Sequence, residues 1–299
     1  MHPDFKLGTD CHDPSGLAMT EGEMDSLVST DWLAMHLGEP DLAIVDASWF
    51  MPASGRGGRA EFLDRHIPGA RFLDIDAVSD RSHPSPHMLP SASEFGAAME
   101  QLGVGREDRI VVYDNSPTRT AARGWFMLGH FGADRVAILD GGFQKWIAES
   151  RPTEGGEAIP RVAKFAATAC DEIVTKDQLL AGTDLPWLDA RGKARFEGTE
   201  RDPRPGVASG HAPGARNLPF SSLYNEDGTF KPLEELRVLF AEAGIDPEKS
   251  FIASCGSGVT ANSLLFAAHL IGNDDPKLYD GSWSEWGADP ATPKVLGPA

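Results

Sequence analysis

The chain has 299 residues, of which 41% are hydrophobic and 24% are charged, and its formal net charge at pH 7 is −18. This length accommodates two domains with separate cores, and the composition is that of an ordinary globular protein. The negative charge argues against a nucleic acid or an anionic membrane surface as a partner, because both attract clustered positive charge.

Residues 1–22 carry no periodic apolar pattern and are interpreted as an N-terminal extension. They lack the basic region and apolar run that are typical of a secretory signal. No apolar run in the chain is long enough to cross a bilayer. We therefore expect a cytoplasmic protein that does not associate with membranes.

The most informative feature of the chain is a set of segments that recur in the same order in both halves. The pairs are LAIVDAS (42–48) with LPWLDAR (185–191), RHIPGAR (65–71) with GHAPGAR (210–216), RIVVYDNS (109–116) with SFIASCGS (250–257), and DGGFQKW (140–146) with DGSWSEW (280–286). Such ordered recurrence indicates two copies of one domain. The predicted boundaries are 23–150 for the first copy, 151–168 for a linker rich in Gly and Pro, and 169–292 for the second copy.

Each half alternates between two kinds of segment. Short apolar runs with β-branched residues, such as RIVVYD and RVAILDG, predict strands, and amphipathic runs such as SASEFGAAMEQLGV and LEELRVLFAEAGI predict helices. Strands separated by helices indicate a parallel sheet that helices cover on both faces, so the predicted fold class is α/β. In such sheets a ligand binds at the carboxyl ends of the strands.

The segment SCGSGVTA (254–261) places Cys255 between a predicted strand and a predicted helix. Free amides and the positive end of a helix dipole meet in such a turn and stabilise a thiolate. The alternative is a small buried hydrophobic residue, which is the usual role of a free cysteine. The position at the end of a strand favours the nucleophile. Alignment of the two halves puts Asp114 where Cys255 stands, so we expect only the second copy to catalyse.

The two-domain pattern, the HxPGA segments, the DGSWSEW ending and above all CGSGVTA resemble the tandem rhodanese family of sulfurtransferases, and in particular its 3-mercaptopyruvate branch. Thiosulfate-preferring relatives carry positively charged residues after the cysteine, in a CRxGVT loop, whereas Gly256 and Ser257 follow it here. The resemblance covers nearly the whole chain. It implies two rhodanese-like domains, each a parallel sheet flanked by helices, with the active loop in the second.

The same resemblance implies a substrate-binding pair of arginines. The segment DARGKARFEGTERDPRPG is similar to the family's substrate-binding segment, and the residues carried over are Arg195 and Arg204. Guanidinium groups bind carboxylates through paired hydrogen bonds, so two of them could hold the carboxylate and carbonyl of an α-keto acid.

The resemblance also implies a Ser-His-Asp relay that spans the two halves. FLDID and HMLP match the segments that contribute Asp76 and His87, which would act with Ser257. The family often has an acidic residue immediately before this histidine, where Pro86 stands here. His66 and His211 recur in both halves and are therefore interpreted as structural.

The implied reaction transfers sulfur in two steps. The Cys255 thiolate attacks the sulfur of 3-mercaptopyruvate, pyruvate leaves, and the sulfur stays on the enzyme as a persulfide. A thiol, such as that of a reduced thioredoxin-like protein, or cyanide then accepts the sulfur, without a metal or an organic cofactor. We expect the backbone amides of the loop to hold the sulfur anion. These amides belong to Gly256, Ser257, Gly258, Val259 and Thr260.

Three other functions are weighed against this one. A phosphatase with a rhodanese-like loop needs an arginine in a CxxxxxR pattern, and the residues GSGVTAN after Cys255 contain none. A non-catalytic rhodanese module for sulfur carriage or docking is disfavoured by the retained cysteine and the paired arginines. A thiosulfate sulfurtransferase is the nearest alternative within the same class of enzyme.

Overall fold

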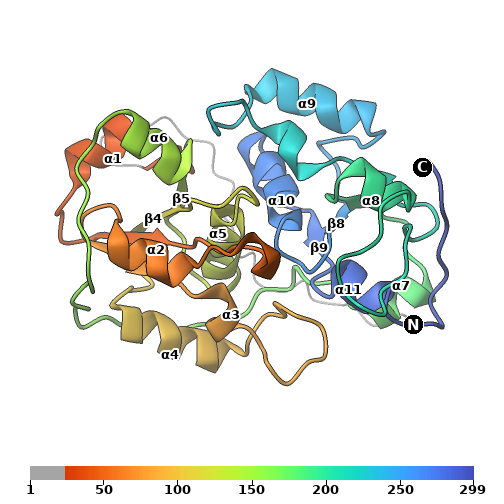
Figure 1. The fold of residues 1–299 in the computed structure, drawn as a ribbon, viewed down its shortest axis with the longest axis horizontal. Helices are drawn as coiled ribbons and strands as arrows, with labels where there is room; N and C mark the ends of the chain where they lie inside the picture. The colour runs from red at the N-terminus through yellow and green to blue at the C-terminus, as the bar shows by residue number, and fades with distance from the viewer. Residues whose placement is uncertain (1–23) are drawn as a thin grey trace, which may run out of the picture.

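The computed structural model describes residues 24–299, which form two α/β domains side by side (Figure 1). The extension predicted for residues 1–22 lies outside the described residues. No helix within residues 24–299 has the length and apolar character needed to cross a membrane.

The first domain is built on a five-stranded parallel sheet in the order β1-β5-β4-β2-β3. Its strands are β1 (Leu27–Val28), β2 (Leu42–Asp46), β3 (Ala70–Phe72), β4 (Arg109–Tyr113) and β5 (Val136–Leu139). The helices are α1 (Thr30–His36), α2 (Gly58–Asp64), α3 (Ile75–Val78), α4 (Ala92–Leu102), α5 (Ala121–His130) and α6 (Gly142–Ala148), with a 3₁₀ turn at Pro52–Ser54. Central strand β4 is buried from Ile110 to Tyr113, which explains its continuous apolar sequence.

The second domain repeats this arrangement with a four-stranded parallel sheet in the order β7-β6-β8-β9. Its strands are β6 (Trp187–Asp189), β7 (Arg216–Asn217), β8 (Ile252–Ser254) and β9 (Lys277–Leu278). The helices are α7 (Lys176–Ala181), α8 (Lys193–Glu197), α9 (Leu233–Glu242), α10 (Ala261–Leu270) and α11 (Ser282–Trp286), with a 3₁₀ turn at Phe220–Leu223. Ile173 forms a parallel bridge to Leu278 where β1 pairs with β5 in the first sheet. The predicted α/β class with parallel sheets is confirmed.

Local sequence signals set the limits of individual helices. Helix α4 begins with a capping box, in which the Ser91 hydroxyl accepts from the Glu94 amide and the Glu94 carboxylate accepts from the Ser91 amide. It ends at Gly103, whose φ of 74° is in the left-handed region.

Helices α5 and α10 pack against each other where the two domains meet (Figure 1). Trp125 of α5 lies edge-on to Phe266 of α10, with ring centroids 4.9 Å apart. One hydrophobic cluster includes Val112 and Met127 of the first domain together with Ala253 and Leu264 of the second. Because the domains share this core, the loops that precede α5 and α10 are held in a defined relation.

The segment between the two sheets packs on the first domain. Phe165 is only 3% exposed and lies edge-on to Phe95, with centroids 5.6 Å apart. Glu154 exchanges two backbone hydrogen bonds with His66, with N–O distances of 2.8 and 2.9 Å.

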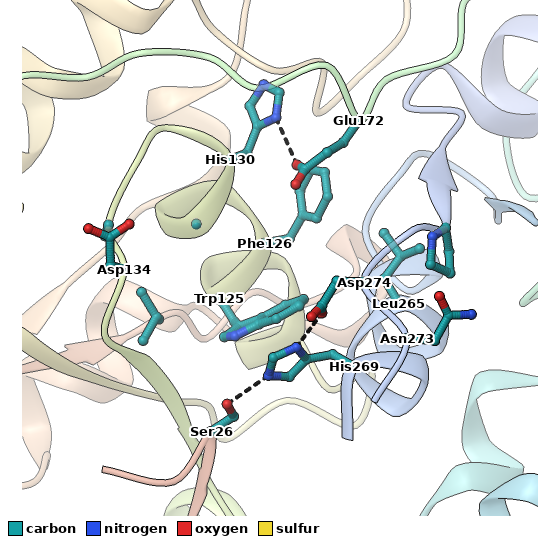
Figure 2. A pocket seen from close by; sticks show the side chains of 14 residues that line it. Ser26, Trp125, Phe126, His130, Asp134, Glu172, Leu265, His269, Asn273 and Asp274 are labelled. Carbon is teal, nitrogen blue, oxygen red and sulfur yellow. Dashed lines mark hydrogen bonds and ion pairs between the residues drawn. The ribbon is translucent and has the colours of Figure 1, made fainter. Parts of the chain in front are cut away.

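A cavity of about 90 Å³ lies between the domains, beside the later turns of α5 and α10. Figure 2 shows His130 directed toward Glu172 at one end and His269 between Ser26 and Asp274 at the other. Cys255 does not line this cavity.

Candidate active site

Cys255 lies directly after β8, and the residues Cys255 to Thr260 connect this strand to α10. The residue is 1% exposed. Its amide donates to the Ser282 hydroxyl at 3.0 Å, and its carbonyl accepts from the Trp283 amide at 3.0 Å. These bonds fix the backbone of the cysteine at the carboxyl end of β8, an inner strand of the sheet, where α/β sheets bind ligands.

Backbone carbonyls of this loop accept hydrogen bonds from groups that surround it. Gly256 O accepts from the Ser284 amide at 2.8 Å, and the Asn262 side chain donates to Gly258 O at 2.6 Å and to Val259 O at 2.8 Å. Gly258 has a φ of +74°, and a Cβ there would lie 2.5 Å from the Asp280 carbonyl oxygen, so only glycine fits.

The amides of the same loop, by contrast, have no acceptor. Within residues 24–299, none of the backbone N–H groups from Gly256 to Thr260 donates a hydrogen bond, although the loop is buried through Val259. Helix α10 also begins without a side-chain cap. Buried amides in native proteins are nearly always paired. The five open amides after Cys255 are therefore candidate donors for an anion.

The matching loop of the first domain is already filled by its own side chain. The Asp114 carboxylate accepts from the amides of Ser116 and Ala121, both at 2.7 Å. Burial raises the pKa of Asp114, and these two amides oppose that effect. The Asp114 carbonyl accepts from the Phe143 amide at 2.9 Å, as the Cys255 carbonyl accepts from Trp283. The two loops therefore have equivalent backbone bonds, but the amides of the first loop bind the carboxylate of its own Asp114.

The structure brings Asp76, His87 and Ser257 into one chain of contacts across the domain boundary. His87 Nδ1 lies 2.9 Å from Ser257 Oγ, and His87 Nε2 lies 3.0 Å from Asp76 Oδ1. The hydrogen bond to His87 lowers the pKa of Asp76, against the effect of partial burial. His87 itself has a φ of 62°, which is rare for a residue other than glycine.

Trp49 supports this chain of contacts, although no sequence motif pointed to it. Its indole N–H donates to Asp76 Oδ2 at 2.9 Å, and its ring stands edge-on to His87 at a centroid distance of 4.9 Å. Both oxygens of the Asp76 carboxylate thus have a donor, which fixes its orientation toward His87.

Arg195 and Arg204 come together over the first residue of the loop. A Cβ added to Gly256 would lie 2.7 Å from Arg204 Nη2 and 3.3 Å from Arg195 Nη2. Burial lowers the pKa of Arg204, and the nearby charge of Arg195 lowers it further. Asp202 and Cys255 act in the opposite direction and raise it. The Arg204 guanidinium therefore lies within electrostatic reach of Cys255.

Asp202 holds the two arginines in place and was missed by the sequence reasoning. Its side chain is 1% exposed and lies 2.6 Å from Arg195 Nη2 and 3.0 Å from Arg204 Nη1. The Nε of Arg195 is buried and has no hydrogen-bond partner. The position of an acidic residue between two arginines, in RFEGTERDPR, was the signal that could have identified it.

His66 and His211 occupy equivalent structural positions away from the thiol. His66 stacks on Phe62 with centroids 3.9 Å apart, and His211 stacks on Phe196 at 3.8 Å. In each pair the histidine Nδ1 bonds to the carbonyl of the aromatic residue, at 2.6 and 2.9 Å. Among the residues that the structure describes, no group of His, Cys, Asp and Glu is arranged to hold a metal ion.

Comparison with known proteins agrees with the duplicated fold. Residues 29–149 and 175–289 each match the rhodanese-like domain. The human protein named 3-mercaptopyruvate sulfurtransferase is 41% identical over 271 residues, which cover 87% of this chain and 91% of the human one. An Arabidopsis thaliana protein named thiosulfate/3-mercaptopyruvate sulfurtransferase 1, mitochondrial, is 40% identical over 295 residues, or 90% of this chain and 78% of the relative.

A solved structure is similar over almost the same range. The crystal structure of SseA from Escherichia coli, described as a 3-mercaptopyruvate sulfotransferase with the rhodanese fold, superimposes with a TM-score of 0.79 at 38% identity. The match covers 88% of this chain and all of SseA. Two α/β domains with parallel sheets of one topology, and a cysteine loop in only the second, define a duplicated α/β protein with a single thiol site. The chain belongs to the rhodanese family.

Proposed function

We propose that the protein is a sulfurtransferase that moves sulfur from 3-mercaptopyruvate through a Cys255 persulfide to a thiol or cyanide acceptor. Relatives about 40% identical over most of the chain carry the name of this activity. The observation that carries the proposal is the loop of unpartnered amides around a single buried cysteine, because it offers an anion site where a persulfide would form.

In the first step, Arg195 and Arg204 hold the carboxylate and carbonyl of the substrate. The buried Nε of Arg195 supports this role, since it is a donor without an acceptor. Cys255 attacks the substrate sulfur, so that an S–S bond forms while the C–S bond breaks. The electron pair goes to the carbon that becomes the methyl group of pyruvate, which then takes a proton.

The Ser257–His87–Asp76 contacts support a role in this proton movement. A histidine that bonds to a hydroxyl on one side and a carboxylate on the other can shift a proton between them. Ser257 belongs to the same loop as Cys255, two residues further along the chain. The relay thus supplies the proton that pyruvate needs, and the acceptor thiol returns it in the second step.

In the second step, a thiolate attacks the outer sulfur of the persulfide and Cys255 leaves as a thiolate. The open amides of the loop stabilise both of these anions. A reduced thioredoxin-like protein is the proposed physiological acceptor. The cytoplasmic location expected from the sequence stays a prediction, since the Arabidopsis relative is named as mitochondrial.

Thiosulfate is the second candidate donor, because the name of the Arabidopsis relative includes it. The loop favours mercaptopyruvate. A side chain at position 256, as in the CRxGVT loops, would meet the Arg204 guanidinium at its Cβ. Here the charge that binds the donor comes instead from two arginines suited to a carboxylate.

The test compares initial rates of sulfur transfer to cyanide from 3-mercaptopyruvate and from thiosulfate. We expect a higher kcat/KM with 3-mercaptopyruvate, continued turnover beyond one equivalent, and one added sulfur atom in the intact mass of the enzyme. Cys255→Ser should lose both the turnover and the added mass. A faster rate with thiosulfate would support the alternative donor, and transfer that stops after one equivalent would support a sulfur carrier.

A further inference from the structure

The two domains meet at two junctions that repeat one another. Asp280, directly before the 281–286 turn and helix of the second domain, accepts the Leu89 amide of the first domain at 2.7 Å. Asp140, its counterpart in the DGG segment, accepts the Phe230 amide of the second domain at 2.8 Å. In each junction an aspartate of one domain therefore binds a backbone amide of the other.

The residues two positions before Leu89 and Phe230 lie in equivalent places, one at the Cys255 loop and the other at the Asp114 loop. His87 stands two residues before Leu89 and contacts Ser257 in the Cys255 loop. Gly228 stands two residues before Phe230, and a Cβ there would lie 2.6 Å from Arg119 Nη1 in the Asp114 loop. Each loop is thus completed by a segment of the opposite domain, but only one of the two segments brings a histidine.

A second difference between the junctions is Arg123. It is the third residue of α5, and the third residue of α10 is Ser263, whose hydroxyl accepts from Tyr224 at 2.9 Å. Arg123 is 0% exposed. Its Nη1 donates to Asp280 Oδ1 at 2.8 Å and to Gly258 O at 3.1 Å, and its Nη2 donates to His87 O at 2.5 Å.

We propose that Arg123 is a positioning residue that sets the Cys255 loop and His87 relative to each other. One guanidinium binds the carbonyl of the loop glycine and the carbonyl of the histidine, and Asp280 neutralises its charge within the junction. The junction that lacks a thiol has Ser263 at the position of Arg123. Its own arginine, Arg119, lies over the Tyr224 ring at 5.1 Å and makes no side-chain hydrogen bond to a loop carbonyl within residues 24–299. Arg123 therefore belongs to the active loop rather than to domain association in general, and this inference rests on the proposed sulfur transfer.

A buried ion pair is often no more stabilising than apolar residues of similar volume. The three hydrogen bonds of Arg123 are directional, so they restrict where their acceptors can lie. His87 adopts a positive φ, which other contacts must enforce. The hydrogen bond to its carbonyl from a fixed guanidinium is such a contact. Displacement of a catalytic group by about 1 Å can cost about a hundredfold in rate.

The test measures kcat and KM for 3-mercaptopyruvate, the melting temperature, and the pH profile of Cys255 alkylation by iodoacetamide, followed by peptide mass. The variant is Arg123→Met, and the matched control is Asp140→Ala, which removes the acceptor at the junction without a thiol. We expect Arg123→Met to lower kcat about tenfold or more with KM within about threefold. Its alkylation profile should move to higher pH. Asp140→Ala should lower the melting temperature and leave kcat and the alkylation profile unchanged.

If Arg123→Met alone folds poorly, Arg123→Met with Asp280→Asn removes both charges and keeps an acceptor for the Leu89 amide. The same loss of kcat in this stable double variant would support the inference. Wild-type kcat and alkylation in either folded variant would overturn it, as would equal losses in Asp140→Ala. A wild-type protein without turnover would contradict the proposed function instead, and the alkylation profiles would still decide whether Arg123 positions the loop.

Discussion

His87 Nδ1 lies 2.9 Å from Ser257 Oγ, although 170 residues and a domain boundary separate them in the chain. The first domain has Asp114 instead of a cysteine in its own loop, yet its His87 and Asp76 form a chain of contacts with Ser257 in the cysteine loop of the second domain. In the proposed mechanism, this contact makes the first domain part of the site although it has no nucleophile.

The relay predicts that Ser257→Ala and His87→Asn lower kcat for 3-mercaptopyruvate by about a hundredfold, with a smaller change in KM, because proton transfer in the transition state is lost. His83→Asn is the control, since His83 contacts Ser85 rather than the relay. Steady-state kinetics between pH 6 and 9 would check this. A kcat equal to that of the control would remove the relay from the mechanism.

The arginine pair predicts a loss in substrate binding. Arg195→Ala or Arg204→Ala should lower kcat/KM, mainly by raising KM. The loss should correspond to about 1.5 to 3 kcal/mol of activation free energy, because a charge-assisted hydrogen bond to the carboxylate is lost. Asp202→Asn should act in the same direction, since it frees both guanidinium groups from their shared partner. Exposed Arg201→Ala is the control. Pyruvate inhibition constants would report the binding directly, and no change in them would place the anion elsewhere.

A thiol placed in the first loop should not create a second active site. Asp114→Cys in a Cys255→Ser background is expected to show no turnover and no added sulfur by mass spectrometry. The reason is that this loop uses its own amides, as when Thr118 N donates to Ser116 Oγ and Arg119 N to Ser116 O. It also lacks a facing histidine. Stable persulfide formation at position 114 would show that a persulfide does not need open amides like those that follow Cys255.

Asp46 predicts a dependence of stability on pH. Burial raises the pKa of Asp46 from 3.8 to about 7, so the folded protein binds a proton that the unfolded chain has released above pH 4. The free energy of unfolding should therefore fall as the pH rises from about 4 to about 7. Asp189 is the equivalent residue of the second domain, and its carboxylate pairs with Arg191 at an N–O distance of 2.6 Å. Ser48 stands in place of that arginine beside Asp46.

The measurement is urea unfolding of the wild type and of Asp46→Asn across this range. The amide keeps an acceptor for the Ser48 amide and carries no charge. We expect the variant to be more stable than the wild type at pH 8, by the order of a few kcal/mol at most, and to lose the advantage at pH 4. A constant difference between the two proteins at all pH values would contradict the prediction.

The sequence alone was enough to determine the duplicated α/β organisation and the cysteine loop. Those features depend on local patterns, since apolar runs such as IVVY predict buried strands and a glycine-containing turn after a strand predicts an anion-binding loop. The repeated segments DGGF and DGSW also make the same contact: the amides of Phe143 and Trp283 donate to the carbonyls of Asp114 and Cys255, respectively. The residues of the relay and of the arginine pair came from resemblance, not from spacing.

Only the tertiary structure decided which side chains meet. The contact of His87 with Ser257, the grip of Asp202 on two arginines and the reach of Arg123 across the domain boundary depend on how α5 and α10 pack in a shared core. Such contacts join residues far apart in the chain, and no local pattern records them. Nor does any local pattern show that the amides after Cys255 stay unpaired, because pairing depends on every group that surrounds the loop.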